Sequence, residues 1–310
     1  MPATLDERAI RLIRQHAATS RLLGVGFVPV SPIAPAISAA IAPAAPAASD
    51  VSWAMAPPVS RQVEPKPKSR PTPASPAPAG SSAPAVVYSP IEIPSGELAP
   101  KKAQALLDEV CGRYEADAPH QYFATDHHNI VFGEGDPRAR LMFVGEAPGE
   151  QEDLQGRPFV GRSGQLLEKM IIAMGLSRET VYIANVLKTR PPNNQTPTVE
   201  EAQLCAGYLF DQIRIIRPEV IVTLGLPASR LLLGTKEPMR AIRGSFRQFP
   251  SGSGEDIFAR LGQAWEGEPV PVMPTYHPAY LLRSYTAENR KKVWGDLKQV
   301  MDRLGLIAKA

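Results

Sequence analysis

From residue 101 onward, short apolar runs alternate with segments of helical periodicity. Continuous apolar runs, typical of strands buried on both faces of a parallel sheet, occur at residues 139–145, 181–187, 219–225 and 270–278. Apolar positions at helical spacing predict helices over residues 101–114, from about Ser163, and over 198–216, 227–234 and 287–305. Thr198 and Glu201 have the spacing of a capping box at the start of one helix. This alternation predicts an α/β domain, a three-layer αβα sandwich around a short, mainly parallel four-stranded sheet.

Composition separates this domain from the first hundred residues. Of the 33 prolines, 17 lie between Phe27 and Pro100, interleaved with alanine and serine. Such a segment lacks the bulky apolar residues that offset ordering entropy, so residues 27–100 are predicted to be a disordered linker. Before it, residues 1–26 predict an amphipathic helix, and we expect residues 5–23 to contact a protein partner. The domain is then assigned to residues 101–310.

Charge gives the domain no broad nucleic-acid signature. The first 100 residues hold 8 of the 34 Lys and Arg and 6 of the 31 Asp and Glu, which leaves 26 basic against 25 acidic residues. Any contact with DNA must therefore come from local geometry. No apolar run is long enough to span a bilayer, and the N-terminus lacks a signal-peptide core. We expect a soluble, cytoplasmic monomer.

Ligands of parallel α/β sheets bind beyond the carboxyl ends of the strands, so the loops that begin at Glu146, Asn185, Leu226 and Tyr276 are the candidate sites. The first loop is acidic, which predicts either a solvated surface or a general base at a strand end. Asn185 either caps a turn or presents its amide to a planar polar ligand. His277, followed by proline at a strand end, is a catalytic candidate rather than a metal ligand.

Phe159 lies in a loop whose glycines and proline fix its shape, which favours a binding platform over a simple core position. The helix that starts near Ser163 offers free backbone N–H groups to a phosphate. Neither a Walker loop nor a GxGxxG motif is present in these loops.

Taken together, these loops resemble those of the family 4 uracil-DNA glycosylases. The stretches that carry the resemblance, between about Ile130 and Leu304, are GEAPGEQEDLQGRPFVGRSGQLL, ANVLKTRPPNNQTP and YHPAYLLR. The resemblance implies that uracil stacks on Phe159, that Asn185 reads its edge, and that His277 bonds its O2. It assigns the catalytic role to Glu146, Asn185 and His277, and uracil binding also to Gly145, Ala147 and Phe159. DNA contacts are expected from Gly161, Ser163, Leu281 and Arg283, with Leu281 as the wedge into the duplex.

The cysteines depart from this family, which generally carries a [4Fe–4S] cluster on four cysteines. Cys111 matches the first and Cys205 the last, whereas Tyr114 and Thr189 stand at the other two positions. Two thiolates cannot hold a cubane cluster in the usual way, so we predict no cofactor and no metal.

The resemblance implies a monofunctional DNA glycosylase that hydrolyses the N-glycosidic bond of deoxyuridine in single- or double-stranded DNA, in base excision repair. Two alternatives stay open from the sequence alone. One is a damaged-DNA-binding or scaffold protein of the same fold that has lost catalysis. The other is an α/β enzyme acting on free nucleotides, against which the missing phosphate-cradling loop counts.

Overall fold

The computed structural model describes residues 88–251, 265 and 268–306. The predicted N-terminal helix and residues 27–87 of the predicted linker lie outside the described residues. Within the described ranges, no helix is long and apolar enough to cross a membrane.

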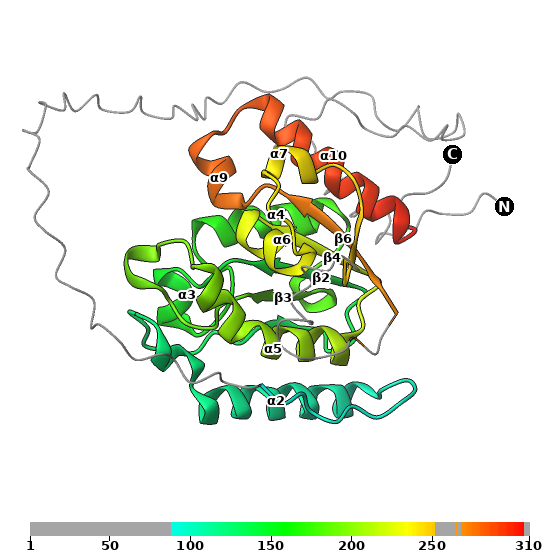
Figure 1. Ribbon diagram of the computed structural model, residues 1–310. Helices are drawn as coiled ribbons and strands as arrows, with labels where there is room; N and C mark the ends of the chain where they lie inside the picture. Colours follow the sequence, from blue (N-terminus) through cyan, green and yellow to red (C-terminus); the bar gives the residue numbers. More distant parts are fainter. Residues whose placement is uncertain (1–87, 252–264, 266–267, 307–310) are drawn as a thin grey trace, which may run out of the picture. The chain divides into compact units, whose positions relative to one another are not determined.

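A six-stranded mixed sheet forms the centre of the domain (Figure 1). Its order is β1-β3-β2-β4-β6-β5, and the four middle strands are parallel. The edge strands β1 and β5 are antiparallel to their neighbours. The strand bounds are β1 Glu134–Gly135, β2 Leu141–Gly145, β3 Tyr182–Asn185, β4 Val220–Leu224, β5 Arg247–Phe249 and β6 Val270–Thr275. The predicted α/β class is confirmed, whereas the predicted number of four strands is wrong.

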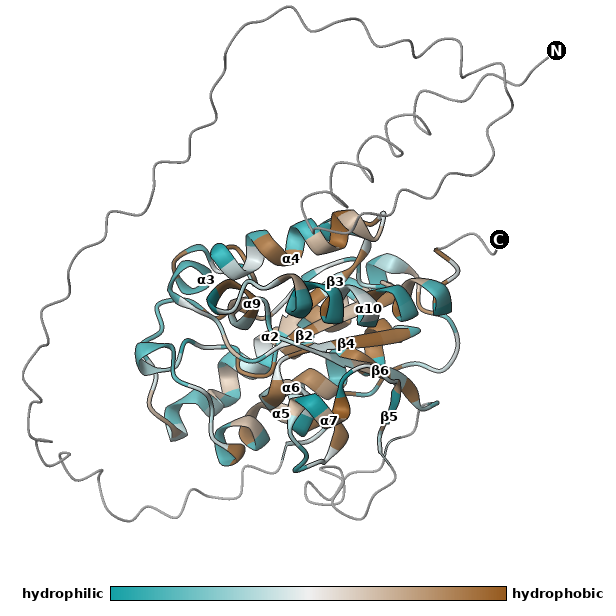
Figure 2. Ribbon diagram, turned by 90° about the horizontal axis from the view of Figure 1, so that it is seen from above, coloured by the Kyte–Doolittle hydropathy of each residue, from teal (hydrophilic) through white to brown (hydrophobic). Residues whose placement is uncertain are grey.

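Helices cover both faces of this sheet (Figure 1). Met142 and Val144 of β2 point into the core shared with α2 Pro100–Asp117, α5 Val199–Ile216 and α6 Leu226–Leu233. Leu141 and Phe143 point into the opposite core, with α4 Arg162–Ala173 and α10 Ala287–Arg303. The four parallel strands are buried along their whole length and mostly brown in Figure 2, because each face of the sheet packs on helices. The remaining helices are η2 Pro119–Tyr122, α3 Glu150–Gln155, η3 Arg178–Thr180, η4 Pro192–Asn194, α7 Met239–Ile242 and α9 Pro278–Arg283.

The predicted capping box of α5 is present. The Glu201 backbone N–H donates to Thr198 Oγ1 at 3.2 Å, and the Thr198 N–H donates to Glu201 Oε2 at 2.8 Å. This arrangement satisfies two N–H groups that would otherwise lack partners at the helix start. The β3–α5 loop therefore ends at a fixed point.

The last part of the predicted linker is packed against the domain. Tyr88, Ile91 and Leu98 are buried in the α2–α5 core. The Tyr88 hydroxyl donates to Asp211 on α5, and the Ile91 N–H donates to the same carboxylate at 3.0 Å. The predicted domain boundary at residue 101 is therefore too late. The prediction missed it because Pro90, Pro94 and Pro100 continue the proline-rich composition of the linker through this segment.

Candidate active site

A cavity of about 360 Å³ lies at the carboxyl edge of the sheet. The loops after β2, β3 and β6 all contribute to its wall, as the parallel topology predicts. Seven of the predicted site residues line it: Glu146, Ala147, Phe159, Ser163, Asn185, His277 and Arg283. The sequence interpretation missed other lining residues, among them Glu152, Asn194, Gln195 and Thr196.

Phe159 has an unusual backbone conformation. Its φ of 53° lies in the left-handed region, which a bulky residue adopts only when its surroundings impose it. On one side, Glu152 Oε1 accepts the N–H groups of Val160 at 2.8 Å and Gly161 at 2.7 Å. Gly161 does not line the cavity, and its N–H is occupied by the Glu152 carboxylate.

On the other side, Arg178 holds the carbonyls of the same loop. Its guanidinium donates to Pro158 O at 2.6 Å and to Phe159 O at 3.0 Å, and it pairs with Glu134 of β1 at 3.2 Å. A side chain on Gly164 would collide with the Phe159 carbonyl, so the first turn of α4 also requires glycine there. The Phe159 ring is thus fixed before any ligand arrives.

Asn185 ends β3 and has an exposed fraction of 1 %. Its Oδ1 atom is buried and has no hydrogen-bond partner within the described part of the protein. Such an acceptor costs about 1–3 kcal/mol unless a ligand satisfies it. Gly145, opposite Asn185 in the β2–β3 register, makes room for it: a Cβ there would overlap Asn185 Oδ1 and lie 2.5 Å from Phe159 Cζ.

His277 caps the N-terminus of α9. Its Nδ1 accepts the Ala279 N–H at 3.1 Å, which leaves the ring proton on Nε2. Burial, with a smaller contribution from the nearby Arg283 charge, lowers the pKa of His277 to about 4. The imidazole is therefore neutral at physiological pH. Its ring centroid is 5.7 Å from that of Phe159, with the planes tilted by 35°.

Glu146 follows β2 directly and contributes a carboxylate to the cavity wall. Burial raises the pKa of Glu146, while a hydrogen bond from Thr196 and the charge of Arg283 oppose this shift. The neighbouring acidic residues have a different role. Glu152 holds the Phe159 loop, and buried Asp153 accepts the N–H groups of His128 at 2.7 Å and Asn129 at 3.0 Å. The interpretation of the loop as a solvated acidic surface is therefore wrong at these two positions.

Comparison with known proteins agrees with this site. The Uracil DNA glycosylase superfamily matches residues 132–298. A Type-4 uracil-DNA glycosylase of Thermotoga maritima is 44 % identical over 172 residues, covering 55 % of this chain and 81 % of that protein. The Type-4 uracil-DNA glycosylase of Archaeoglobus fulgidus is 40 % identical over 181 residues, covering 57 % and 83 %. The chain belongs to the type-4 group of the uracil-DNA glycosylase superfamily. A Type-5 relative from Pyrobaculum aerophilum is 31 % identical over 162 residues, which cover 64 % of that protein.

Leu281, the residue predicted to enter the duplex as a wedge, is not exposed at this type-4 site. Leu281 has an exposed fraction of 1 % and packs in the α4–α10 core. Pro278 and Leu281 share the inward face of the short helix α9, whereas Tyr280 and Leu282 are exposed. Leu281 is therefore unavailable to enter a duplex in this conformation. Sequence spacing alone did not reveal which face of so short a helix is buried.

The residues at the cluster positions of type-4 enzymes do not fit a four-cysteine cluster here. Tyr114 is fully buried, its hydroxyl lies 3.9 Å from Cys205 Sγ, and its ring packs edge-on against Tyr208 with centroids 4.9 Å apart. Cys111 lies nearby on α2 but bonds Glu115. Nowhere in the described ranges do three or more His, Cys, Asp or Glu side chains gather in a way that could hold a metal ion.

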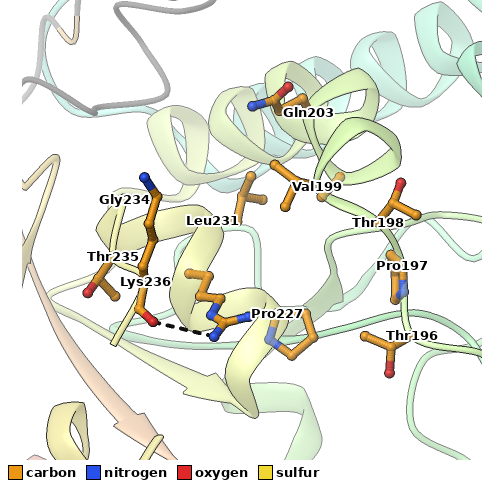
Figure 3. Close-up of a pocket in the computed structure, with 12 residues that line it drawn as sticks. Thr196, Pro197, Thr198, Val199, Gln203, Pro227, Leu231, Gly234, Thr235 and Lys236 are labelled. Carbon is orange, nitrogen blue, oxygen red and sulfur yellow. Dashed lines mark hydrogen bonds between the residues drawn. The ribbon is translucent and has the colours of Figure 1, made fainter. Parts of the chain in front are cut away.

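A second, more apolar groove of about 300 Å³ lies between the start of α5 and α6 (Figure 3). Val199 and Leu231 form its apolar wall, and Arg230 donates to the Lys236 carbonyl at 3.4 Å along its rim. It contains none of the predicted site residues, although Thr196 borders both cavities. Of these two cavities, the polar one at the sheet edge contains the candidate catalytic side chains.

Proposed function

We propose that this chain is a monofunctional uracil-DNA glycosylase that hydrolyses the N-glycosidic bond of deoxyuridine in DNA. Water adds to C1′ of the deoxyribose, the bond to N1 breaks, and the products are free uracil and an abasic site. The observation that supports this most directly is the convergence of Phe159, Asn185 and His277 on one cavity at the sheet edge.

Uracil recognition falls to Asn185 and Phe159. The unpartnered Oδ1 of Asn185 accepts the uracil N3–H, while its amide nitrogen donates to O4. Cytosine presents the opposite pattern at both atoms, so a fixed amide rejects it. Stacking of the flipped base on Phe159 contributes about 1–3 kcal/mol, which offsets part of the cost of flipping.

Bond cleavage leaves negative charge on the uracil. The neutral His277 ring, with its proton on Nε2, donates to O2 and stabilises this charge without transferring a full proton. Such a preorganised donor supplies about 3–4 kcal/mol of barrier reduction. The Glu146 carboxylate favours the positive charge on the sugar and orients the water. Ser163, at the start of α4, contributes its backbone N–H to a DNA phosphate, and Arg283 contributes its charge at the cavity rim. The Gly161 N–H, expected to make a DNA contact, already donates to Glu152 Oε1 at 2.7 Å.

The chain works in this proposal without a metal or an iron–sulfur cluster, because Tyr114 and Thr189 replace two ligands of the type-4 set. Stoichiometric iron and sulfide in the purified protein would contradict it. A protein partner for residues 5–23, a monomeric state and a cytoplasmic location are further proposals that rest on the sequence.

The test is release of free uracil from single- and double-stranded DNA by the wild-type protein, Asn185→Ala and His277→Ala. Each variant should lose about 100- to 1,000-fold in the single-turnover rate. Equal rates in all three proteins would refute the site assignment. Tight binding of uracil-containing DNA by a wild-type protein that releases no uracil would favour the non-catalytic alternative, against which the complete Asn185 and His277 pair counts.

A further inference from the structure

Lys188 is a buried amine that the proposed chemistry does not use. It follows Asn185 on the β3–α5 loop and has no exposed surface. Its Nζ donates to the Asn185 carbonyl at 2.8 Å and to Gln212 Oε1 on α5 at 2.6 Å. The amine also lies 5.2 Å from the centroid of the Phe132 ring.

This amine lacks the counter-charge that buried lysines normally have. Among the described residues, no carboxylate oxygen forms an ion pair with Lys188 within 4.0 Å. Burial lowers the pKa of Lys188 to about 7, because removal from water destabilises the protonated amine. Its two hydrogen-bond contacts are therefore its main polar interactions.

The Asn185 carbonyl needs such a donor because the sheet does not supply one on that side. Strand β1 pairs with β3 only at Tyr182 and Ile183 and ends before Asn185. Lys188 fills this gap and extends the connection to α5. Gln212 in turn donates to the Phe132 carbonyl at 3.0 Å and to the Tyr182 hydroxyl at 3.2 Å, which fixes its own orientation.

We propose that Lys188 is a positioning residue for uracil recognition. Its amine links the Asn185 carbonyl to Gln212 by hydrogen bonds, and this link fixes the position of the Asn185 backbone and of the side-chain amide that binds the base. This inference rests on the proposed function, since it gives the Asn185 amide its role. Asn185 Oδ1 has no hydrogen-bond partner among the described residues, so the direction of the side-chain amide depends on the position of the Asn185 backbone.

The experiment compares Lys188→Met and Gln212→Met in the full chain, each alone and combined with Asn185→Ala. Tyr208→Phe is the matched control, because it removes a partly buried hydrogen bond of 2.7 Å from α5 to Asp117 without touching Asn185. Single-turnover uracil release and thermal unfolding are measured on every protein. A crystal structure of Lys188→Met reports the position of Asn185 directly.

Lys188→Met should release uracil about 10- to 100-fold more slowly, because small misplacement of a binding group costs this much. The double variant Lys188→Met/Asn185→Ala should release uracil less than about twofold more slowly than Asn185→Ala, since the amide that Lys188 positions is already absent. Gln212→Met should give a smaller loss in the same pattern, and it carries the test if Lys188→Met does not fold. Tyr208→Phe should match the wild-type rate.

Losses that multiply in the double variants, or an Asn185 unmoved in the Lys188→Met structure, would overturn the positioning role. A wild-type protein that releases no uracil would instead refute the proposed function. In that case the displacement of Asn185 in the crystal structure still decides whether Lys188 holds it.

Discussion

Two regions of the domain bury polar groups in opposite ways. At the carboxyl edge of the sheet, Asn185 Oδ1 is buried without a partner, and the pKa of Glu146 is raised by burial. On the α2–α5 face, which we define by Tyr88, Tyr114, Cys205 and Tyr208, the buried hydroxyls of Tyr88 and Tyr208 donate to Asp211 and Asp117. The edge keeps one buried acceptor, Asn185 Oδ1, free for a ligand, whereas on the face the Tyr88 and Tyr208 hydroxyls are paired with carboxylates. His120 Nδ1, whose ring stacks on Tyr114, is an exception beside the face, with no hydrogen-bond partner in the described part of the chain.

This difference indicates which region serves ligand binding and which stabilises the fold. Unpaired polar groups persist only where the surrounding structure holds them, and they concentrate at functional sites. The α2–α5 face instead resembles an ordinary core with paired hydroxyls. We therefore expect substitutions at the edge to change excision more than stability, and substitutions on the face to do the reverse.

Among substitutions that leave Phe159, Asn185 and His277 themselves in place, the largest effect should come from Gly145→Ala. The new Cβ would overlap Asn185 Oδ1 and the Phe159 ring, so both recognition groups must shift. Uracil release should fall by about 100-fold or more in single-turnover assays. Gly112→Ala on α2 is the control, because a Cβ there meets nothing within 4 Å. It should raise stability by about 0.5–1 kcal/mol and leave the rate unchanged. Equal rate losses in the two variants would erase the distinction between edge and face.

The central strands and the recognition residues could be predicted because each carries a strong local signal. Runs such as residues 139–145 are apolar on both faces, and Phe159, Asn185 and His277 come in motifs next to strand ends. The edge strands were missed because they are too short for a pattern. Strand β1 has two residues, and β5 exposes Arg247 and Gln248.

The supporting contacts could not be predicted because they join residues far apart in the chain. Nothing near Arg178 indicates that it holds the carbonyls of residues 158 and 159, or that Glu134 pairs with it. Lys188 looks like a surface lysine in a polar loop, yet it is fully buried. Only the three-dimensional packing of β1, α5 and the β3–α5 loop reveals these roles.

A smaller effect is expected from Arg178→Lys. A lysine cannot reproduce the two hydrogen bonds to the Pro158 and Phe159 carbonyls, so the left-handed Phe159 can relax. Uracil release should fall about 10-fold, mainly through weaker binding of the flipped base. The matched change on the α2–α5 face is Arg214→Lys, which disturbs the ion pair with Asp211 at 2.7 Å. It should lower the unfolding temperature and spare the rate; a loss of excision there equal to that of Arg178→Lys would contradict the comparison.

The smallest effect is a severalfold dependence on pH, and it should arise at the edge alone. On the α2–α5 face, burial raises the pKa of Cys205 to about 12 and also raises the pKa of Tyr88, so both stay neutral from pH 5 to 8. At the edge, burial raises the pKa of Glu146, while that of His277 is about 4. As the pH falls from 7, Glu146 therefore takes up its proton before His277 does.

Single-turnover rates between pH 8 and pH 4 measure this order. The wild-type rate should fall toward acid pH as the Glu146 carboxylate is lost, because the protonated form no longer stabilises the positive sugar. Glu146→Gln should be slower throughout but flat until His277 is charged near pH 4. Lys188 titrates closer to pH 7, yet its amine keeps N–H donors in both forms, so its contact with Asn185 survives the change. If the rate of Glu146→Gln declines with falling pH in parallel with the wild-type rate, the titrating group is not Glu146. The contrast in pH dependence between the edge and the α2–α5 face would then be wrong.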